Sequence, residues 1–210
     1  MYSTVVSSMA SMGAIRDSSH DLYDFESDDN NKKWKNILLL SLEQIQKRVY
    51  PSLRANPDAL QYVEWLILKL LSSLIHNQLN SVSDVEERVK RLFPYPLDKW
   101  AITKANETLV LLKTHKKQKS LTADQLPIRM PVERVHQLLQ KEVFGHKIDV
   151  QITQYLVAIL EYIAADIFQL AGHYVKNIRH EEISCQDIKV LLDVFPVFAL
   201  FCPLFMQSFR

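Results

Sequence analysis

The chain has 210 residues, with 25 Lys and Arg against 24 Asp and Glu and a formal net charge of +1. It contains three glycines, too few for a phosphate-binding loop or a dinucleotide-binding fingerprint, because both need closely spaced glycines. This charge balance argues against a general nucleic-acid binder, whose domains are usually strongly basic. Hydrophobic residues make up 48% of the chain, enough for a buried core. Together these numbers favour helices joined by short loops.

The two cysteines, Cys185 and Cys202, do not form the closely spaced pairs of a structural zinc site. Two cysteines also cannot build the disulfide framework of a secreted domain, so a reducing cytoplasm is expected. We expect no metal and no cofactor.

The first 30 residues have the composition of a disordered acidic segment. Residues 17–29 hold six Asp or Glu and neither Lys nor Arg, and such runs are usually solvated tails. Residues 1–15 lack the continuous apolar stretch of a secretory signal peptide.

Helical periodicity begins at Lys33 and predicts one helix that ends before Pro51. A long helix is predicted from Pro57 to Ile75. A short helix follows, with a capping box between Ser83 and Glu86. A further amphipathic helix is predicted over 97–112, with these side chains facing inward: Trp100, Ala101, Ala105, Leu109 and Leu112.

The same order returns in the second half. A helix over 131–143 precedes a loop at Gly145, a long helix covers 150–177, and Ser184 with Asp187 caps a short last helix. A long helix flanked by two shorter ones cannot bury its apolar stripe alone. The doubled order therefore predicts two units that pair within the chain. The expected boundaries are a first unit at 31–112, a basic linker at 113–130, a second unit at 131–193 and an apolar tail at 194–210.

Two runs carry a resemblance to a known family. Residues 131–141 (PVERVHQLLQK) and 160–172 (LEYIAADIFQLAG) resemble the first and the long helix of the histone fold, in the class that pairs as the A-type partner. Small residues in the second run, Ala164, Ala165, Ala171 and Gly172, would let two long helices cross closely. A generic helical bundle is the alternative.

Further runs, at 58–64, 83–89, 98–102 and 177–180, are similar to the N-terminal histone-like domain of the Son of sevenless family of Ras exchange factors. The resemblance covers residues 32–193. It implies an all-α fold of two tandem histone folds that form an intrachain pseudo-dimer. It also implies a non-catalytic, monomeric module, cytoplasmic and peripheral to the plasma membrane. Such a module holds the exchange factor autoinhibited and meets the Ras-type GTPase only indirectly.

The resemblance implies that acidic phospholipids bind to a basic surface. Residues 113–147 hold eight Lys or Arg against three Asp or Glu, and a basic cluster near an anionic membrane contributes about 1 kcal/mol per cation. A solvated linker is the alternative. The candidate lipid-binding residues are Lys113, Lys116, Lys117, Lys119, Arg129, Lys141 and Lys147.

The resemblance also implies docking on other domains of the exchange factor. Glu161 and Asp166 are the candidate docking residues, and an arginine from a later interdomain linker is expected near Asp166.

Catalysis and DNA binding are both disfavoured. No catalytic residue is assigned, because His180-Glu-Glu lacks the second histidine of a metalloprotease helix and no nucleophile elbow is present. Sequences typical of the downstream exchange domains are not found, so we expect no exchange activity. DNA binding is the weighed alternative: Gln137 and Gln140 stand where histones carry basic residues, and acids stand in the loop before the last helix. An inert truncation product is the other alternative.

Overall fold

The fold is all-α, as predicted. The computed structural model describes residues 23–76, 79–115 and 127–194. The predicted tail from 195 onward, Lys116, Lys117 and Lys119 lie outside these residues. The elements in chain order are α1 (Asp28–Trp34), α2 (Leu39–Val49), β1 (Arg54–Ala55), α3 (Pro57–Ile75), α4 (Val82–Leu92), α5 (Leu97–His115), α6 (Val132–Leu138), the π-helix η3 (Leu139–Phe144), α7 (Val150–Asn177), β2 (Glu182–Ile183) and α8 (Cys185–Val194).

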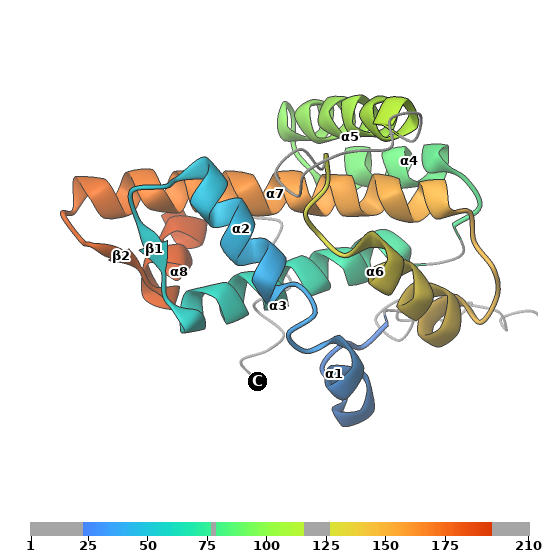
Figure 1. Cartoon of the computed structure of the whole chain (residues 1–210), viewed down its shortest axis with the longest axis horizontal. Coiled ribbons are helices and arrows are strands. Elements are labelled where there is room, and N and C mark those ends of the chain that lie inside the picture. The colour runs from blue at the N-terminus through green and yellow to red at the C-terminus, as the bar shows by residue number, and fades with distance from the viewer. Residues whose placement is uncertain (1–22, 77–78, 116–126, 195–210) are drawn as a thin grey trace, which may run out of the picture.

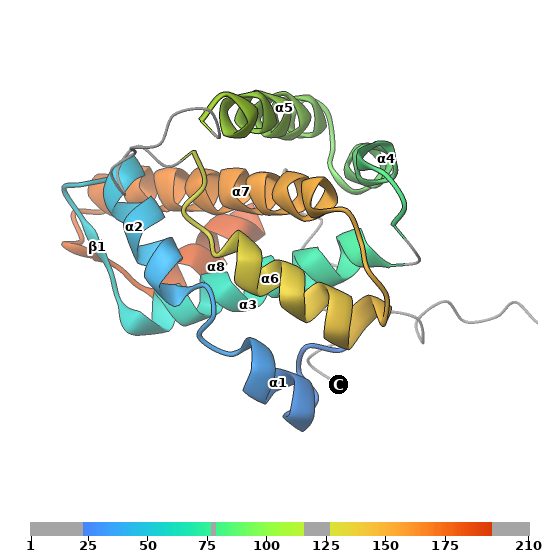
Figure 2. The same ribbon diagram turned by 45° about the vertical axis from the view of Figure 1, so that its right-hand side comes forward.

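Helix α7 is the central element. It runs the length of the molecule, with α3 along one side and α5 on the other (Figures 1 and 2). Because it is covered on several sides, its apolar residues are not confined to one stripe. By length and composition alone α7 could cross a membrane, but 72% of its apolar window is buried inside the protein. Its apolar character therefore fits a core position.

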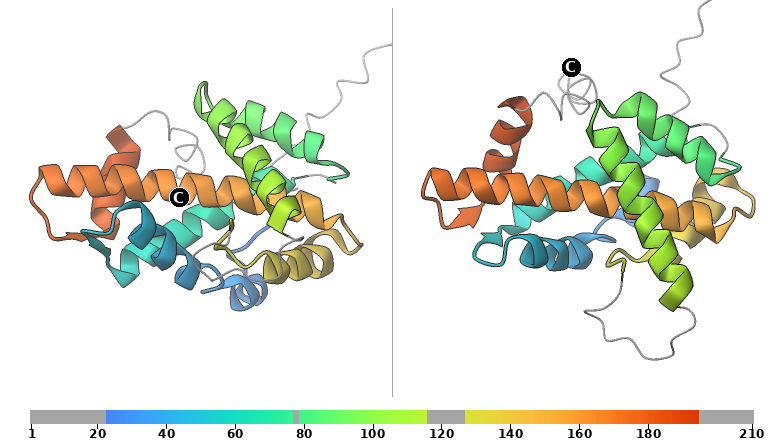
Figure 3. Two further views of the ribbon diagram at one scale, coloured as in Figure 1. Left: turned by 45° about the horizontal axis from the view of Figure 1, so that its top comes forward. Right: turned by 90° about the horizontal axis from the view of Figure 1, so that it is seen from above.

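The helix order medium, long, short occurs twice, as α2–α3–α4 and as α6/η3–α7–α8. One strand from each set joins them: β1 pairs with β2 in parallel, with Arg54 opposite Glu182. The N–H of Asn56 extends this contact by donating to the carbonyl of Ile183 at 2.9 Å. Helix α5 stands outside the repeated order and crosses over α7 (Figure 3).

The start of α2 differs from the prediction of one helix from Lys33 to Val49. The chain breaks between α1 and α2, where Asn36 adopts a positive φ of 64°. The buried carboxylate of Glu64, on α3, accepts hydrogen bonds from the N–H groups of Asn36 at 3.0 Å and Leu38 at 2.8 Å. Burial raises the pKa of Glu64, although these N–H groups favour its charged form. The N–H groups at the start of a helix have no acceptor within the helix. At the start of α2, the carboxylate of Glu64 supplies acceptors.

Part of the segment predicted to be disordered is packed. Residues 23–34, here called the N-terminal strap, lie against α3 and η3. Phe25 is 5% exposed and Trp34 is fully buried, and both belong to the main hydrophobic core. The packed chain thus begins by residue 23, and the expectation of disorder through residue 30 was wrong for 23–30. Residues 1–22 lie outside the described part.

The predicted caps are confirmed at one helix and shifted at another. At α8, the backbone N–H and hydroxyl of Ser184 both donate to Asp187, as predicted. At α4 the capping box joins Ser81 and Asp84, two residues before the predicted pair. On α5, Trp100 is 57% exposed, so its predicted inward position was wrong, whereas Ala101 and Ala105 are fully buried.

Candidate lipid- and partner-binding surfaces

Glu161 of α7 is held inside the fold. Its carboxylate accepts hydrogen bonds from the backbone N–H groups of Arg129 at 2.6 Å and Met130 at 3.1 Å. Arg48 of α2 donates a further bond to it at 3.3 Å. The Glu161 side chain is 7% exposed. These contacts tie the segment before α6, and the end of α2, to the centre of α7.

The assignment of Glu161 as a partner-docking residue is therefore corrected. A buried carboxylate needs hydrogen-bond donors, and the chain itself supplies three to Glu161. A docking arginine would have to displace Arg48 or the backbone. A signal was present in the sequence: the positions around Glu161 on the helix are apolar, which indicates a buried face and an internal partner.

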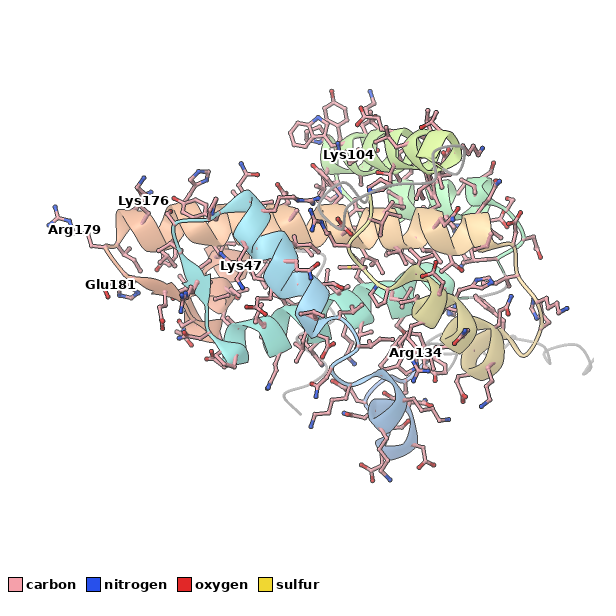
Figure 4. All side chains as sticks on the ribbon, viewed as in Figure 1. Lys47, Lys104, Arg134, Lys176, Arg179 and Glu181 are labelled. Atoms are coloured by element: carbon pink, nitrogen blue, oxygen red, sulfur yellow. The ribbon has the colours of Figure 1, made fainter. Side chains whose placement is uncertain are left out.

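A pocket of about 400 Å³ lies next to Glu161, between α2, α5 and α7. Its wall includes the cations Arg48 and Lys104 and the residues Thr108, Tyr162 and Ala165. Figure 4 shows Lys104 on α5. The pocket was not expected, because it needs the crossing of α5 over α7, which helical periodicity does not encode.

Asp166 has the opposite surroundings to Glu161. It is half-buried on α7, and none of the described residues forms a hydrogen bond or ion pair with its carboxylate. Burial alone raises the pKa of Asp166. Tyr162 lies one turn earlier on α7. Burial raises the pKa of Tyr162, and the carboxylate of Asp166 raises it further. A half-buried carboxylate without a cation is a place where an arginine from outside the described chain would be stabilised.

Three of the candidate lipid-binding lysines fall in the described part of the chain. Lys141 on η3 and Lys147 in the loop before α7 are both exposed. Gly145, between them, adopts the left-handed φ of 66° that turns the chain into α7. Lys113 is exposed in the last turns of α5. These lysines therefore come from separate elements.

Arg129 differs from these lysines. Its backbone N–H binds Glu161, and the residue is only partly exposed. It therefore takes part in the internal contact described above, and its availability to a lipid is lower than the sequence suggested. Lys116, Lys117 and Lys119, the densest part of the basic run, lie outside the described residues.

The end of the molecule at β1 and β2 carries mixed charge. Lys176 and Arg179, at the C-terminal end of α7, lie at the same end of the molecule as Glu181 (Figure 4). Arg54 of β1 pairs in register with Glu182 of β2. Acids thus interrupt the cations at this end, which disfavours phosphate-backbone binding there. In the described part of the chain, no group of three His, Cys, Asp or Glu side chains lies together as metal ligands would.

No protein-family model matches the chain. Over 174 residues the chain is 43% identical to the protein Son of sevenless of Drosophila melanogaster, covering 82% of the chain and 10% of that protein. It is 27% identical over 164 residues to the Son of sevenless homolog of Caenorhabditis elegans, covering 72% of the chain and 10% of that protein. It is also 32% identical over 65 residues to a histone of Agaricus bisporus, covering 31% of the chain and 47% of the histone.

These similarities confirm the resemblance that the sequence motifs indicated. The chain belongs to the Son of sevenless family, and its likeness to a histone agrees with a histone-like fold. It spans about one tenth of the length of the two Son of sevenless proteins.

Proposed function

We propose that the chain is a non-catalytic regulatory module of a Son of sevenless-type Ras exchange factor, which docks on other domains of that factor and binds acidic membrane lipids. The observation that carries the proposal is Asp166: a half-buried carboxylate with a raised pKa and no cation among the described residues. The similarity to Son of sevenless proteins supports placing the chain within an exchange factor. Such a module would work in the cytoplasm, peripheral to the plasma membrane.

The proposed architecture is a pair of tandem histone folds within one chain. Its support is the doubled helix order, the packing of α3 against α7, and the parallel pairing of β1 with β2, one strand from each copy. The first copy would be α2–α4 and the second α6–α8. Because each copy covers the other's long helix, the module would be monomeric.

Docking would use Asp166 and exclude Glu161. An arginine from another domain would gain a charge-assisted hydrogen bond and remove the cost of burying an unpaired carboxylate. Glu161, already paired with Arg48, would hold α7 and the segment before α6 in place beside this surface. Docking would stabilise the autoinhibited arrangement of the factor, and Ras itself would be met only indirectly.

The docking experiment measures nucleotide release from a Ras-type GTPase by a full-length exchange factor. Release is followed with the wild-type chain, with Asp166→Arg, and with Glu87→Arg as a control that reverses an exposed carboxylate on α4. We expect the wild-type and control chains to change the rate of the factor and Asp166→Arg to lose the effect. An equal response to all three chains rejects docking through Asp166 and favours an inert truncation product. Acceleration by the chain in the absence of the factor rejects the non-catalytic assignment.

The lipid experiment measures binding to vesicles with and without phosphoinositide or phosphatidic acid. Reversing Lys141 and Lys147 to Glu is expected to weaken binding to acidic vesicles, and so is reversing Lys116, Lys117 and Lys119. Added salt is expected to weaken it too, because the attraction is electrostatic. Lys90→Glu, on the exposed side of α4, is the control. If vesicle binding changes neither with added salt nor with charge reversal of these lysines, the basic run is a linker and does not bind lipid.

DNA binding or pairing with a separate histone-fold chain is the second candidate, favoured by the similarity to a histone. The mixed charge at the β1–β2 end argues against a DNA site there. Titration with duplex DNA at physiological salt, beside the vesicles, separates the two functions. Tight DNA binding with no preference for acidic lipid would reverse our order of candidates.

A further inference from the structure

The N-terminal strap is held by a few identifiable anchors. Tyr23, Phe25 and Trp34 form an edge-to-face aromatic group. The ring centroid of Phe25 lies 4.8 Å from the ring centroid of Tyr23 and 4.8 Å from that of Trp34. The carbonyl of Tyr23 accepts a hydrogen bond from Ser72 of α3 at 2.8 Å. Lys33 forms a 2.6 Å ion pair with Glu142 of η3. These anchors bind the strap to α3 and η3.

Glu26 adds a charged anchor on the outer side. It accepts a hydrogen bond from the indole N–H of Trp65 at 2.5 Å and pairs with Lys69 at 3.0 Å. Burial acts to raise the pKa of Glu26, but the bonds from Trp65 and Lys69 outweigh it and keep the pKa below its ordinary value. Among the described residues, Glu26 is the acid of the strap that pairs with a cation on α3.

A surface pocket lies beside the strap. It has a volume of about 180 Å³ and lies between the strap and α3. The pocket is lined by Phe25, Glu26 and Trp34 from the strap and by Trp65 and Lys69 from α3. The pocket opens to solvent, so the outer edge of the strap is not fully packed against α3, although Phe25 and Trp34 are buried in the core.

The hydroxyl group of Tyr23 is the sensitive point of this arrangement. Tyr23 is half-buried, and its phenol oxygen accepts a hydrogen bond from the indole N–H of Trp34 at 3.3 Å. The charges that act on the phenol are those of Lys33, Glu142 and Asp24. Lys33 is already paired with Glu142. A negative group on the phenol would therefore meet two carboxylates and one occupied cation.

We propose that Tyr23 is a phosphorylation site for a tyrosine kinase, and that its phosphate releases the N-terminal strap from α3 and η3. The segment has the composition of a substrate, because acids flank Tyr23 on both sides and neither Lys nor Arg occurs from 17 to 29. A phosphotyrosine carries about −1.5 to −2 charges at neutral pH. Its charge would be repelled by Glu142 and Asp24, and its bulk would separate the phenol from Trp34.

The chemical step is an ordinary phosphoryl transfer from ATP. The phenol oxygen forms a bond to the γ-phosphorus, and the bond from that phosphorus to the β–γ bridging oxygen breaks. ADP leaves, and the phenolic proton passes to the base of the kinase. Release of the strap would uncover Trp65 and Leu68 of α3, at the pocket described above. This inference does not depend on the proposed docking or lipid functions.

The test treats the full chain with the catalytic domain of a tyrosine kinase and Mg-ATP. Mass spectrometry locates the phosphate, and hydrogen exchange reports the strap. Tyr23→Phe removes the acceptor and keeps the ring. Tyr95→Phe is the matched control, because Tyr95 is 74% exposed but lies between two prolines in an acid-poor segment. We expect phosphate on Tyr23 in the wild-type and Tyr95→Phe chains, and none at that position in Tyr23→Phe.

Exchange of the α1 amides is expected to rise by roughly tenfold or more on phosphorylation, as in a locally unfolded segment, while α7 stays protected. Two results overturn the proposal. One is an unmodified Tyr23 in the folded chain while the same kinase labels Tyr95. The other is a phosphorylated Tyr23 with unchanged exchange in α1, which would mean that the strap tolerates the phosphate.

Discussion

Gly172 of α7 lies directly against the ring of Tyr50, the residue that follows the last turn of α2. A Cβ atom added at position 172 would fall 2.5 Å from Cγ of Tyr50, closer than real Cβ contacts occur. The small residue is thus required by the aromatic ring of the residue that follows α2. The predicted reason, the crossing of the two long helices, does not apply at this position.

Replacing Gly172 with Ala is expected to destabilise the fold. Overpacking of this kind typically costs about 1–3 kcal/mol. The better helix propensity of Ala offsets up to about 1 kcal/mol of that. In a Tyr50→Ala background the clash is absent, so Gly172→Ala should then be neutral or stabilising. Urea denaturation of the four chains gives the coupling between the two positions. A stabilised Gly172→Ala single variant would contradict the contact.

Glu161→Gln should lower the stability of the isolated chain, because the donors to Glu161 all come from the chain itself. The amide oxygen still accepts from the backbone of Arg129 or Met130. However, the charge that holds Arg48 is lost, and the amide nitrogen meets donors. Leaving buried donors unsatisfied costs about 1–3 kcal/mol. The measurement is chemical denaturation, with Glu87→Gln as the exposed control. Equal stability of Glu161→Gln and wild type would return Glu161 to the list of docking candidates.

The contrast between Glu161 and Asp166 shows what the sequence can predict here. Helix positions, the doubled order and the Ser184 cap follow from periodicity and local capping rules, because they depend on neighbours in the chain. Which of two carboxylates on α7 is satisfied depends on Arg48 and on the backbone at 129–130. These lie 113 and about 32 residues away in sequence. The break before α2 depends in the same way on Glu64. Local patterns do not carry such contacts.

The shifted cap of α4 gives a direct comparison of two serines. Ser81→Ala is expected to cost about 1 kcal/mol, because the hydroxyl accepts from the N–H of Asp84 at the start of the helix. Ser83→Ala should have little effect, because Ser83 is exposed and inside the helix. Thermal denaturation of both variants measures the difference. A larger loss for Ser83→Ala would restore the predicted capping box.

The cap also predicts a pH dependence. Hydrogen bonds from the N–H of Asn80 and from Ser81 lower the pKa of Asp84. Its contribution is therefore present above the ordinary pKa of an aspartate and is lost as the pH falls through the lowered value. The stability deficit of Asp84→Asn relative to wild type should shrink as the solution is acidified. A deficit that is constant with pH would mean that the charge of Asp84 is unimportant.

Asp166 should show the opposite dependence. Burial raises its pKa in the folded state above the ordinary value of about 3.9. Its contribution to stability is then complete below the ordinary value and is lost as the pH rises through the raised one. Asp166→Asn, which cannot ionise, should therefore melt at a higher temperature than wild type at neutral pH, and the difference should vanish in acid. Melting curves of both chains across this pH range, with Glu87→Gln as the exposed control, provide the measurement. A residue retained at a cost to stability is expected when its charge serves binding. If Asp166→Asn is instead destabilised at neutral pH, the carboxylate already has a partner within the chain and is not free to dock.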